Sequence, residues 1–208
     1  MYVISVKSHI ISLFQHFMIL LLQKTGKMEF YTAKHGKGLQ FINGNIVKHN
    51  GTQAWQTCIF GKEINNKMCK QFSISVKVRK GYNTNFMFGY ITSTIEEVFG
   101  NQSLGSSLWN KSLGSSANCR TYEVHYYYDC FHEWPGDKPL TNYKAPDRFQ
   151  AGDTFKCVFN FGNNEFIIYH NGTKAQTLPI LNNAKTVRFA ICPAKKDSEI
   201  EIINYELL

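Results

Sequence analysis

Strict alternation of apolar and polar residues is the feature that most restricts how this chain can fold. In residues 72 to 79, FSISVKVR, every second side chain is hydrophobic. Successive side chains of a β-strand point to opposite faces, so this pattern is typical of an antiparallel strand with one buried face. The pattern predicts that Phe72, Ile74, Val76 and Val78 face the core.

The same period of two recurs further along the chain. In residues 153 to 161, DTFKCVFNF, it places Phe155, Cys157 and Phe159 on one face. The Gly-Asn-Asn triplet that follows tolerates positive φ, and EFIIYH after it is rich in strand formers, so the two segments predict a hairpin. Further strands are predicted at residues 86–91, 122–128, 187–192 and 199–207. No segment after residue 28 has a helical apolar period.

Several short strands separated by turns predict two packed sheets, because a sheet with one apolar face must bury that face against another layer. We therefore expect an all-β fold, a two-sheet antiparallel β-sandwich. Hydrophobic residues make up 43% of the chain and charged residues 18%, which is ordinary for a globular protein. A chain of 208 residues suits one such domain, which we place at residues 28–208.

The first 27 residues contain an apolar stretch, IISLFQHFMILLL, at residues 10 to 22. This stretch is shorter than the ~20 apolar residues of a membrane span and is not followed by a small-x-small cleavage pattern. We expect residues 1–27 to be an extension outside the fold, with Met28 as the start of the domain and no stable membrane span. A signal or anchor, and an extra helix docked on the domain, remain open alternatives.

Charge and cysteine content bear on partners and compartment. The formal net charge is +8, but Lys and Arg are spread along the whole sequence, which favours a solvated surface over a nucleic-acid partner. Six cysteines in 208 residues are too sparse for a disulfide-built scaffold. We expect reduced, structural thiols and a cytoplasmic location.

The chain resembles the SPRY family, whose members are concanavalin A-like β-sandwiches of the jelly-roll type. FSISVKV followed by FGY, with its glycine at Gly89, is similar to the family's early paired strands, and residues 152–172 are similar to its central hairpin. LPIL near residue 178 and FAICP at residues 189–193 resemble the closing strands. The resemblance implies a non-catalytic module that binds a peptide or protein partner through loops at one end of the sandwich.

Two long connections, residues 99–121 and 129–152, are the places where we look for a binding site, because loops of this length in a compact domain tend to be functional. Trp, Tyr and Arg are the residue types enriched at binding hot spots. Such residues in and beside these connections give the candidate partner-binding set: Trp109, Tyr126, Tyr128, Trp134, Tyr143 and Arg148.

Catalytic and metal chemistry find little support. Cys119, His125, Cys130 and His132 are zinc-type ligands, but they lack the close Cys-Cys or His-His spacing of a structural site, so we expect no metal and no cofactor. Glu199 and Glu201 are predicted to share one solvent face of a strand, unlike the facing carboxylates of a glycosidase. No nucleophile elbow or phosphate-cradling glycine loop is present, and we expect no enzyme activity.

Carbohydrate binding is the alternative function. An aromatic ring that stacks on a sugar beside amide and charged groups is the usual recognition scheme, and Trp134 with Glu133, Asn142 and Arg148 offers those groups. The order of residues found in galectins, a His-x-Asn-x-Arg strand followed by a Trp-x-x-Glu strand, is not found. Protein binding therefore remains the first hypothesis.

Overall fold

The computed structural model describes residues 29–32, 35–36, 38–52, 57–80, 86–92, 94, 119–124, 130–134, 138–145 and 149–208, without the side chain of Trp134. Regular structure in these residues is β, apart from one 3₁₀ turn at Leu181–Asn183. No helix among them is long and apolar enough to span a membrane. The possible N-terminal helix and the fate of residues 1–27 lie outside the described residues.

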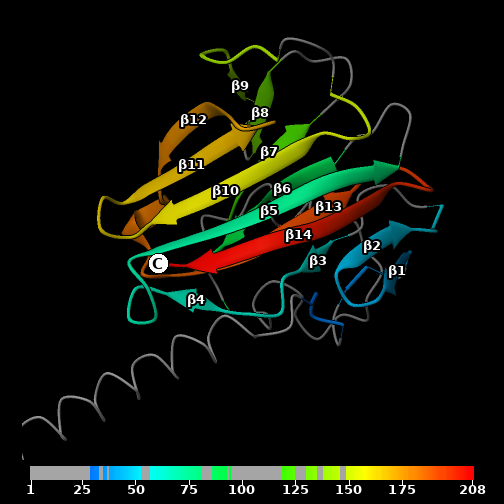
Figure 1. The fold of residues 1–208 in the computed structure, drawn as a ribbon, viewed down its shortest axis with the longest axis horizontal. Coiled ribbons are helices and arrows are strands. Elements are labelled where there is room, and N and C mark those ends of the chain that lie inside the picture. The colour runs from blue at the N-terminus through cyan, green and yellow to red at the C-terminus, as the bar shows by residue number, and fades with distance from the viewer. Residues whose placement is uncertain are drawn as a thin grey trace, which may run out of the picture.

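The first sheet has seven antiparallel strands in the order β1-β2-β14-β5-β10-β11-β12 (Figure 1). Its strands are β1 Leu39–Ile42, β2 Ile46–His49, β5 Gln71–Lys80, β10 Thr154–Asn160, β11 Glu165–His170, β12 Thr173–Pro179 and β14 Glu199–Leu207. The chain's last strand, β14, thus lies between β2 and β5 and closes the centre of this sheet.

The second sheet has the order β3-β13-β6-β7-β8-β9, and β4 also pairs with β13. Its strands are β3 Cys58–Ile59, β4 Ile64–Asn65, β6 Phe86–Ile91, β7 Cys119–Val124, β8 Phe131–Trp134, β9 Lys138–Leu140 and β13 Thr186–Pro193. The two sheets pack face to face, which makes the protein a β-sandwich (Figure 1).

The strands predicted from the alternating pattern are confirmed, with ends that differ by up to three residues. The four alternate residues of β5 expected to face the core are each 1% exposed or less. The predicted strand 122–128 begins earlier, at Cys119, and residues 125–128 lie outside the described residues. The short strands β1 to β4, β8 and β9 were not predicted, because two to four residues are too few to establish a period. Of β12, only the end near residue 178 was recognised, because its sequence TKAQTLP does not alternate.

The core between the sheets is built mainly from phenylalanine and tyrosine rings. Phe155 of β10 packs on Phe86 of β6, with ring centroids 5.4 Å apart, and Tyr90 of β6 packs on Phe166 of β11 at 5.0 Å. All four rings are fully buried. Burial of each such ring contributes about 1.5–3 kcal/mol, so these aromatic residues contribute substantially to stability.

These ring contacts show which strand ends of one sheet lie over which strand ends of the other. The start of β10 lies over the start of β6, and the start of β11 lies over the end of β6. At the first of these ends, the segments that join strands include residues 81–85, 125–130 and 141–153, which contain five of the tyrosines in the sequence. We call this the tyrosine end.

Candidate functional site

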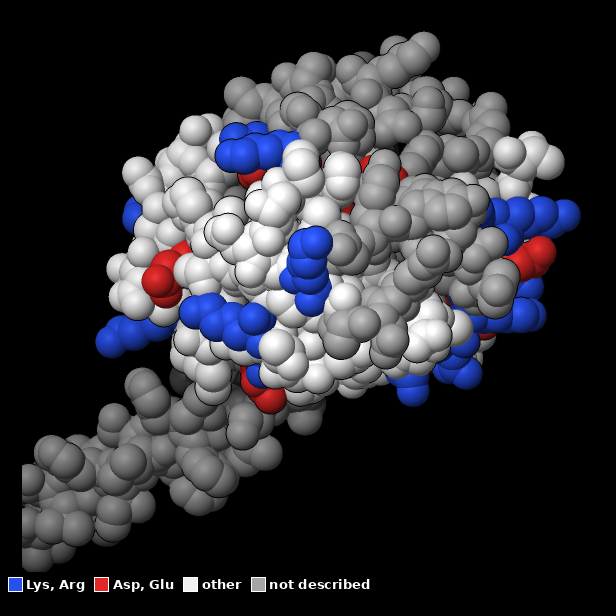
Figure 2. All heavy atoms as spheres, turned by 90° about the horizontal axis from the view of Figure 1, so that it is seen from above, with Lys and Arg blue, Asp and Glu red and all other residues white. Residues whose placement is uncertain are grey.

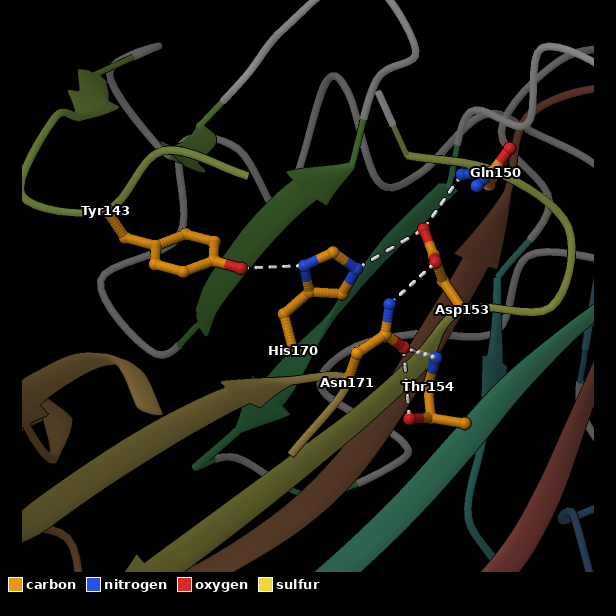
Figure 3. A network of polar contacts seen from close by, with 6 residues as sticks. All are labelled: Tyr143, Gln150, Asp153, Thr154, His170 and Asn171. Carbon is orange, nitrogen blue, oxygen red and sulfur yellow. Dashed lines mark hydrogen bonds and ion pairs between the residues drawn. The ribbon is translucent and has the colours of Figure 1, made fainter. Parts of the chain in front are cut away.

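The segment between β9 and β10, residues 141–153, is held to the tyrosine end by a polar network (Figure 3). The hydroxyl oxygen of Tyr143 lies 2.8 Å from Nδ1 of His170, the last residue of β11. The Tyr143 ring also stacks on Phe131 of β8, with centroids 6.0 Å apart. A loop side chain is therefore fixed by both sheets of the sandwich.

His170 is the centre of this network. Its Nε2 lies 3.3 Å from a carboxylate oxygen of Asp153, and its ring is stacked on Phe155 at a centroid distance of 5.0 Å. His170 is 3% exposed and Asp153 is 6% exposed. The contact between Nε2 and Asp153 is at ion-pair distance, and the other ring nitrogen, Nδ1, faces the Tyr143 hydroxyl.

Asp153 is held by two further donors. The backbone N–H of Gln150 donates to one carboxylate oxygen at 2.8 Å, and the side-chain amide of Asn171 donates to the other at 2.9 Å. The amide oxygen of Asn171 in turn accepts from the backbone N–H of Thr154 at 2.8 Å. Asn171 has a positive φ of 48°, a conformation that asparagine tolerates better than most residues. The turn after β11 thus completes the network (Figure 3).

The hydrogen bonds of the network stabilise the ionised form of Asp153. Burial alone would raise the pKa of the Asp153 carboxyl, but the hydrogen bonds from His170, Asn171 and Gln150 outweigh burial and lower it below the usual value. Burial, and then the nearby Asp153 carboxylate, raise the pKa of the Tyr143 hydroxyl, which therefore stays protonated and able to donate. The arrangement suits positioning of the 141–153 segment, since His170 and Asp153 are too buried to meet a ligand directly.

Four of the predicted site residues belong to segments that begin or end at the tyrosine end. Tyr143 is described and half-buried there. Tyr126, Tyr128 and Arg148 lie outside the described residues, but the ends of β7 and β8 that flank the two tyrosines, and Phe149 after Arg148, are at this end. The ring centroids of Phe149 and Phe131 are 5.3 Å apart.

The strand ends next to the other two predicted residues lie away from the tyrosine end. Trp109 lies outside the described residues, and the connection that carries it leaves β6 at Ile91, opposite Arg188 near the start of β13. Trp134 of β8 pairs with Thr121 of β7, towards that same end of the sheet. The two long connections are therefore rooted at opposite ends, whereas the sequence led us to expect one shared surface.

The zinc-type residues are also separated. Cys119 is paired with Ile91 at the end of β7 away from the tyrosine end, and Cys130 immediately precedes β8 at the tyrosine end. His132 lies in β8, and His125 lies outside the described residues. All six cysteines of the chain are free and buried, and burial raises the pKa of the Cys119 thiol to about 12. These cysteines act as small core side chains, as the sequence suggested.

The basic residues of the chain are spread over the described surface. On the face seen in Figure 2, Lys and Arg side chains are separated by uncharged residues, with few acidic side chains among them. Several basic side chains are paired, such as Arg79 with Glu201 at 3.4 Å and Lys156 with Glu206 at 3.5 Å. Glu199 and Glu201 are both in strand β14, where Glu199 forms an ion pair with Lys48 and Glu201 with Arg79. This agrees with the prediction that the two carboxylates share one face of the strand.

Sequence reasoning missed His170, Asp153 and Asn171 as members of a site. Asp153 and Asn171 lie within residues 152–172, which the sequence indicated only as a hairpin. The hairpin register gives the missing signal, because Phe155 pairs with His170 and this register sets Asp153 beside the turn that contains Asn171. Nothing in the sequence indicates that Tyr143 reaches the same place.

No family model and no curated protein matches the sequence. Solved structures do match the fold. The SPRY domain of human HERC1 aligns with a TM-score of 0.59 at 12% identity, covering 83% of this chain and 96% of that one. The PSpry domain of TRIM65 aligns with a TM-score of 0.61 at 9% identity, covering 88% and 96%.

A carbohydrate recognition domain is similar as well. That of Emp46p aligns with a TM-score of 0.51 at 11% identity, covering 84% of this chain and 86% of that one. The shared feature is the pair of antiparallel sheets, and the alignments to SPRY domains score higher. The chain therefore has the SPRY-type β-sandwich fold that the resemblance in its sequence predicts.

Proposed function

We propose that this protein is a non-catalytic interaction module that binds a peptide or protein partner at the tyrosine end. The resemblance to the SPRY family implies protein binding, and solved SPRY domains have the same fold. Fold alone does not fix function, so the proposal depends on the site. The observation that carries it is the Tyr143–His170–Asp153 network, which holds the 141–153 segment in place with buried side chains.

A rigid support of this kind favours binding. Ordering a loop before the partner arrives removes an entropic cost from association. The residues proposed to touch the partner are Tyr126, Tyr128, Tyr143 and Arg148, because Tyr and Arg bury much surface while keeping a polar group for hydrogen bonding. Trp109 and Trp134 remain candidates for a separate contact, since their segments are rooted elsewhere.

The thiols support a proposal for the cellular setting. Six free, buried cysteines in one domain are typical of a protein kept in a reducing compartment. We place the module in the cytoplasm, where a peptide segment of another protein is available as partner. Immunofluorescence of the full chain tests the location, and accumulation in the secretory pathway would contradict it.

The experiment that tests the function is capture of partners from lysate of the source cell with the full chain, read by mass spectrometry. The test variant is Tyr126→Ala/Tyr128→Ala/Arg148→Ala, and the comparison variant is Trp109→Ala/Trp134→Ala. Circular dichroism confirms that both fold. The captured partner is then titrated against each protein by calorimetry.

The proposal predicts that the first variant binds the titrated partner at least about tenfold more weakly, which corresponds to about 1.4 kcal/mol, and that the second retains most affinity. Full affinity in the first variant would remove the tyrosine end as the binding site. Loss in the second variant alone would move the site to the Trp109 and Trp134 segments.

Carbohydrate binding is the second candidate, supported by the similarity to the Emp46p carbohydrate recognition domain. Its groups would be the aromatic side chain of Trp134 and the exposed amide of Asn142. The charged group beside them would be the carboxylate of Glu133. It lies 3.2 Å from the guanidinium of Arg120 and is already ion-paired. A glycan array probed with the full chain separates the two functions: sugar-dependent retention supports the lectin, and a blank array supports the protein-binding module.

A further inference from the structure

Basic residues gather where β5 ends, next to the start of β10 and therefore at the tyrosine end. The start of β14 lies between two neighbours there, with Glu199 opposite Lys48 of β2 and opposite Lys80 of β5 (Figure 1). The exposed basic side chains of this region are Lys77, Arg79, Lys80, Lys195 and Lys196. We call these five residues the basic rim.

The end of β5 is joined by backbone hydrogen bonds to the segment that precedes β10. The N–H of Gly152 donates to the carbonyl of Val78 at 2.8 Å, and the N–H of Val78 donates to the carbonyl of Asp153 at 2.9 Å. Arg79 and Lys80 follow Val78 directly. The basic rim therefore borders the segment that the polar network of Figure 3 holds in place.

The turn that carries Lys195 and Lys196 is held by backbone hydrogen bonds as well. The N–H of Asp197 donates to the carbonyl of His49 at 2.7 Å, and the N–H of His49 donates to the carbonyl of Ser198 at 2.9 Å. The two lysines thus extend from a turn whose backbone is anchored on the end of β2.

Acidic groups close to the basic rim do not cancel its charge. Lys48 lies 3.8 Å from both Asp197 and Glu199, and Arg79 lies 3.4 Å from Glu201. With Lys48, this surface has six cations and three carboxylates, which leaves an excess of three positive charges.

The remaining charged residues of the tyrosine end leave this excess in place. The carboxylates of Asp153 and Glu123 belong to residues that are only 6% and 7% exposed. The segments that join strands at this end otherwise contain as many basic as acidic residues, namely Lys144, Arg148, Asp129 and Asp147. Lys174, at the start of β12, adds one more exposed cation. The surface of this end is therefore positive.

We propose that the peptide segment bound at the tyrosine end is acidic and that its carboxylates face the basic rim. This inference rests on the proposed function, because it names the chemistry of the partner that the tyrosine end binds. A positive surface steers a partner of opposite charge and disfavours basic partners. The three carboxylates among the cations favour a peptide with separated acidic side chains over nucleic acid, since a closely spaced row of phosphates would be repelled by them.

The test is an array of short immobilised random peptides, probed with the full chain. The test variant is Lys77→Gln/Lys80→Gln/Lys196→Gln, which leaves the ion pair of Arg79 intact. The matched control is Lys67→Gln/Lys70→Gln/Lys185→Gln, which removes the same charge from exposed lysines before the starts of β5 and β13, at the opposite end. Circular dichroism confirms that both variants fold.

We expect the peptides retained by the wild type to be enriched in aspartate and glutamate. The test variant is expected to bind the strongest of them about tenfold more weakly, and the control nearly as the wild type does. Three results would overturn the inference: no retained peptide, retained peptides without acidic enrichment, or equal losses in the two lysine variants. A DNA duplex bound through the same three lysines, with no acidic peptide retained, would assign the basic rim to nucleic acid and likewise refute it.

The variant Tyr126→Ala/Tyr128→Ala/Arg148→Ala separates this inference from the proposed function. If neutral peptides are retained and this variant loses them, the tyrosine end is a peptide site and only the acidic preference is refuted. If acidic peptides need the lysines of the basic rim but bind this variant as well as the wild type, the acidic preference is supported and the tyrosine end is refuted as the site.

Discussion

The hydroxyl of Tyr143 is 2.8 Å from Nδ1 of His170, and through this contact a loop residue is tied to the end of the central hairpin. His170 also contacts Asp153, which immediately precedes β10, the other strand of the same hairpin. The 141–153 segment is therefore closed into a loop fixed at both of its ends. The contacts tie the described parts of the segment, residues 141–145 and 149–153, to the central hairpin.

Replacement of Tyr143 by phenylalanine tests the first link of this network. The variant keeps the ring packed on Phe131 and loses only the hydroxyl. We expect the free energy of unfolding to fall by about 1 kcal/mol, the usual net value of one hydrogen bond. Urea denaturation gives that value, and amide exchange in residues 141–145 is expected to speed up. Unchanged exchange would show that the hydroxyl does not hold the segment.

Replacement of His170 by phenylalanine tests the centre of the network. An aromatic ring remains against Phe155, but Asp153 loses a buried partner. Leaving a buried polar group without its partner costs about 1–3 kcal/mol, so the loss of stability is expected to exceed that of Tyr143→Phe. The double variant Tyr143→Phe/His170→Phe completes a cycle, and strict additivity of the two losses would contradict a shared network.

The pH dependence of stability tests the Asp153 carboxylate. Its pKa is lowered in the folded protein, so its contribution is fully present above the unfolded value near ~3.9 and is lost as the pH falls through the folded value. Urea midpoints measured from neutral to acid pH are expected to fall less steeply for Asp153→Asn than for the wild type. Glu206 has a pKa shift of the same sign, mainly from Lys156, but its side chain is 44% exposed, so solvent screens the pair. Glu206→Gln therefore serves as a control and is expected to change the profile little.

Gly89 of β6 tests the close approach of two strands. A Cβ atom at this position would lie 2.1 Å from the carbonyl oxygen of Arg120, which is backbone of β7 and cannot move aside. We expect Gly89→Ala to lower the free energy of unfolding by about 3 kcal/mol. Gly162→Ala is the matched control, because its nearest neighbour, the Asn160 side chain, is at 3.4 Å. Equal midpoints for the two variants in urea would refute this explanation of the glycine.

The sequence was sufficient for the sandwich because its long strands alternate cleanly. In β5 and β10 every second residue is apolar, and those residues form the core. Short strands such as β9, with the sequence KPL, carry no period that could be recognised. Their pairing depends on neighbours far away in the sequence, as with Leu140 opposite Phe131.

The site was less predictable than the fold. Residue type alone selected Tyr143, which the structure places in a buried network, but residue type could not show that Trp134 lies in a strand facing Thr121 instead of beside Tyr143. Which end of the sandwich a connection leaves from depends on strand direction in the assembled sheets. His170 could not be predicted as a site residue for the same reason. Its partner Tyr143 is 27 residues away in the sequence.

Amide hydrogen exchange of the full chain, with and without its captured partner, tests the central claim most directly. The proposal predicts that the partner slows exchange in residues 125–130 and 141–152 and leaves the turns at residues 66–70 and 181–185 unchanged. Protection confined to other parts of the chain, with residues 125–130 and 141–152 unaffected, would contradict binding at the tyrosine end.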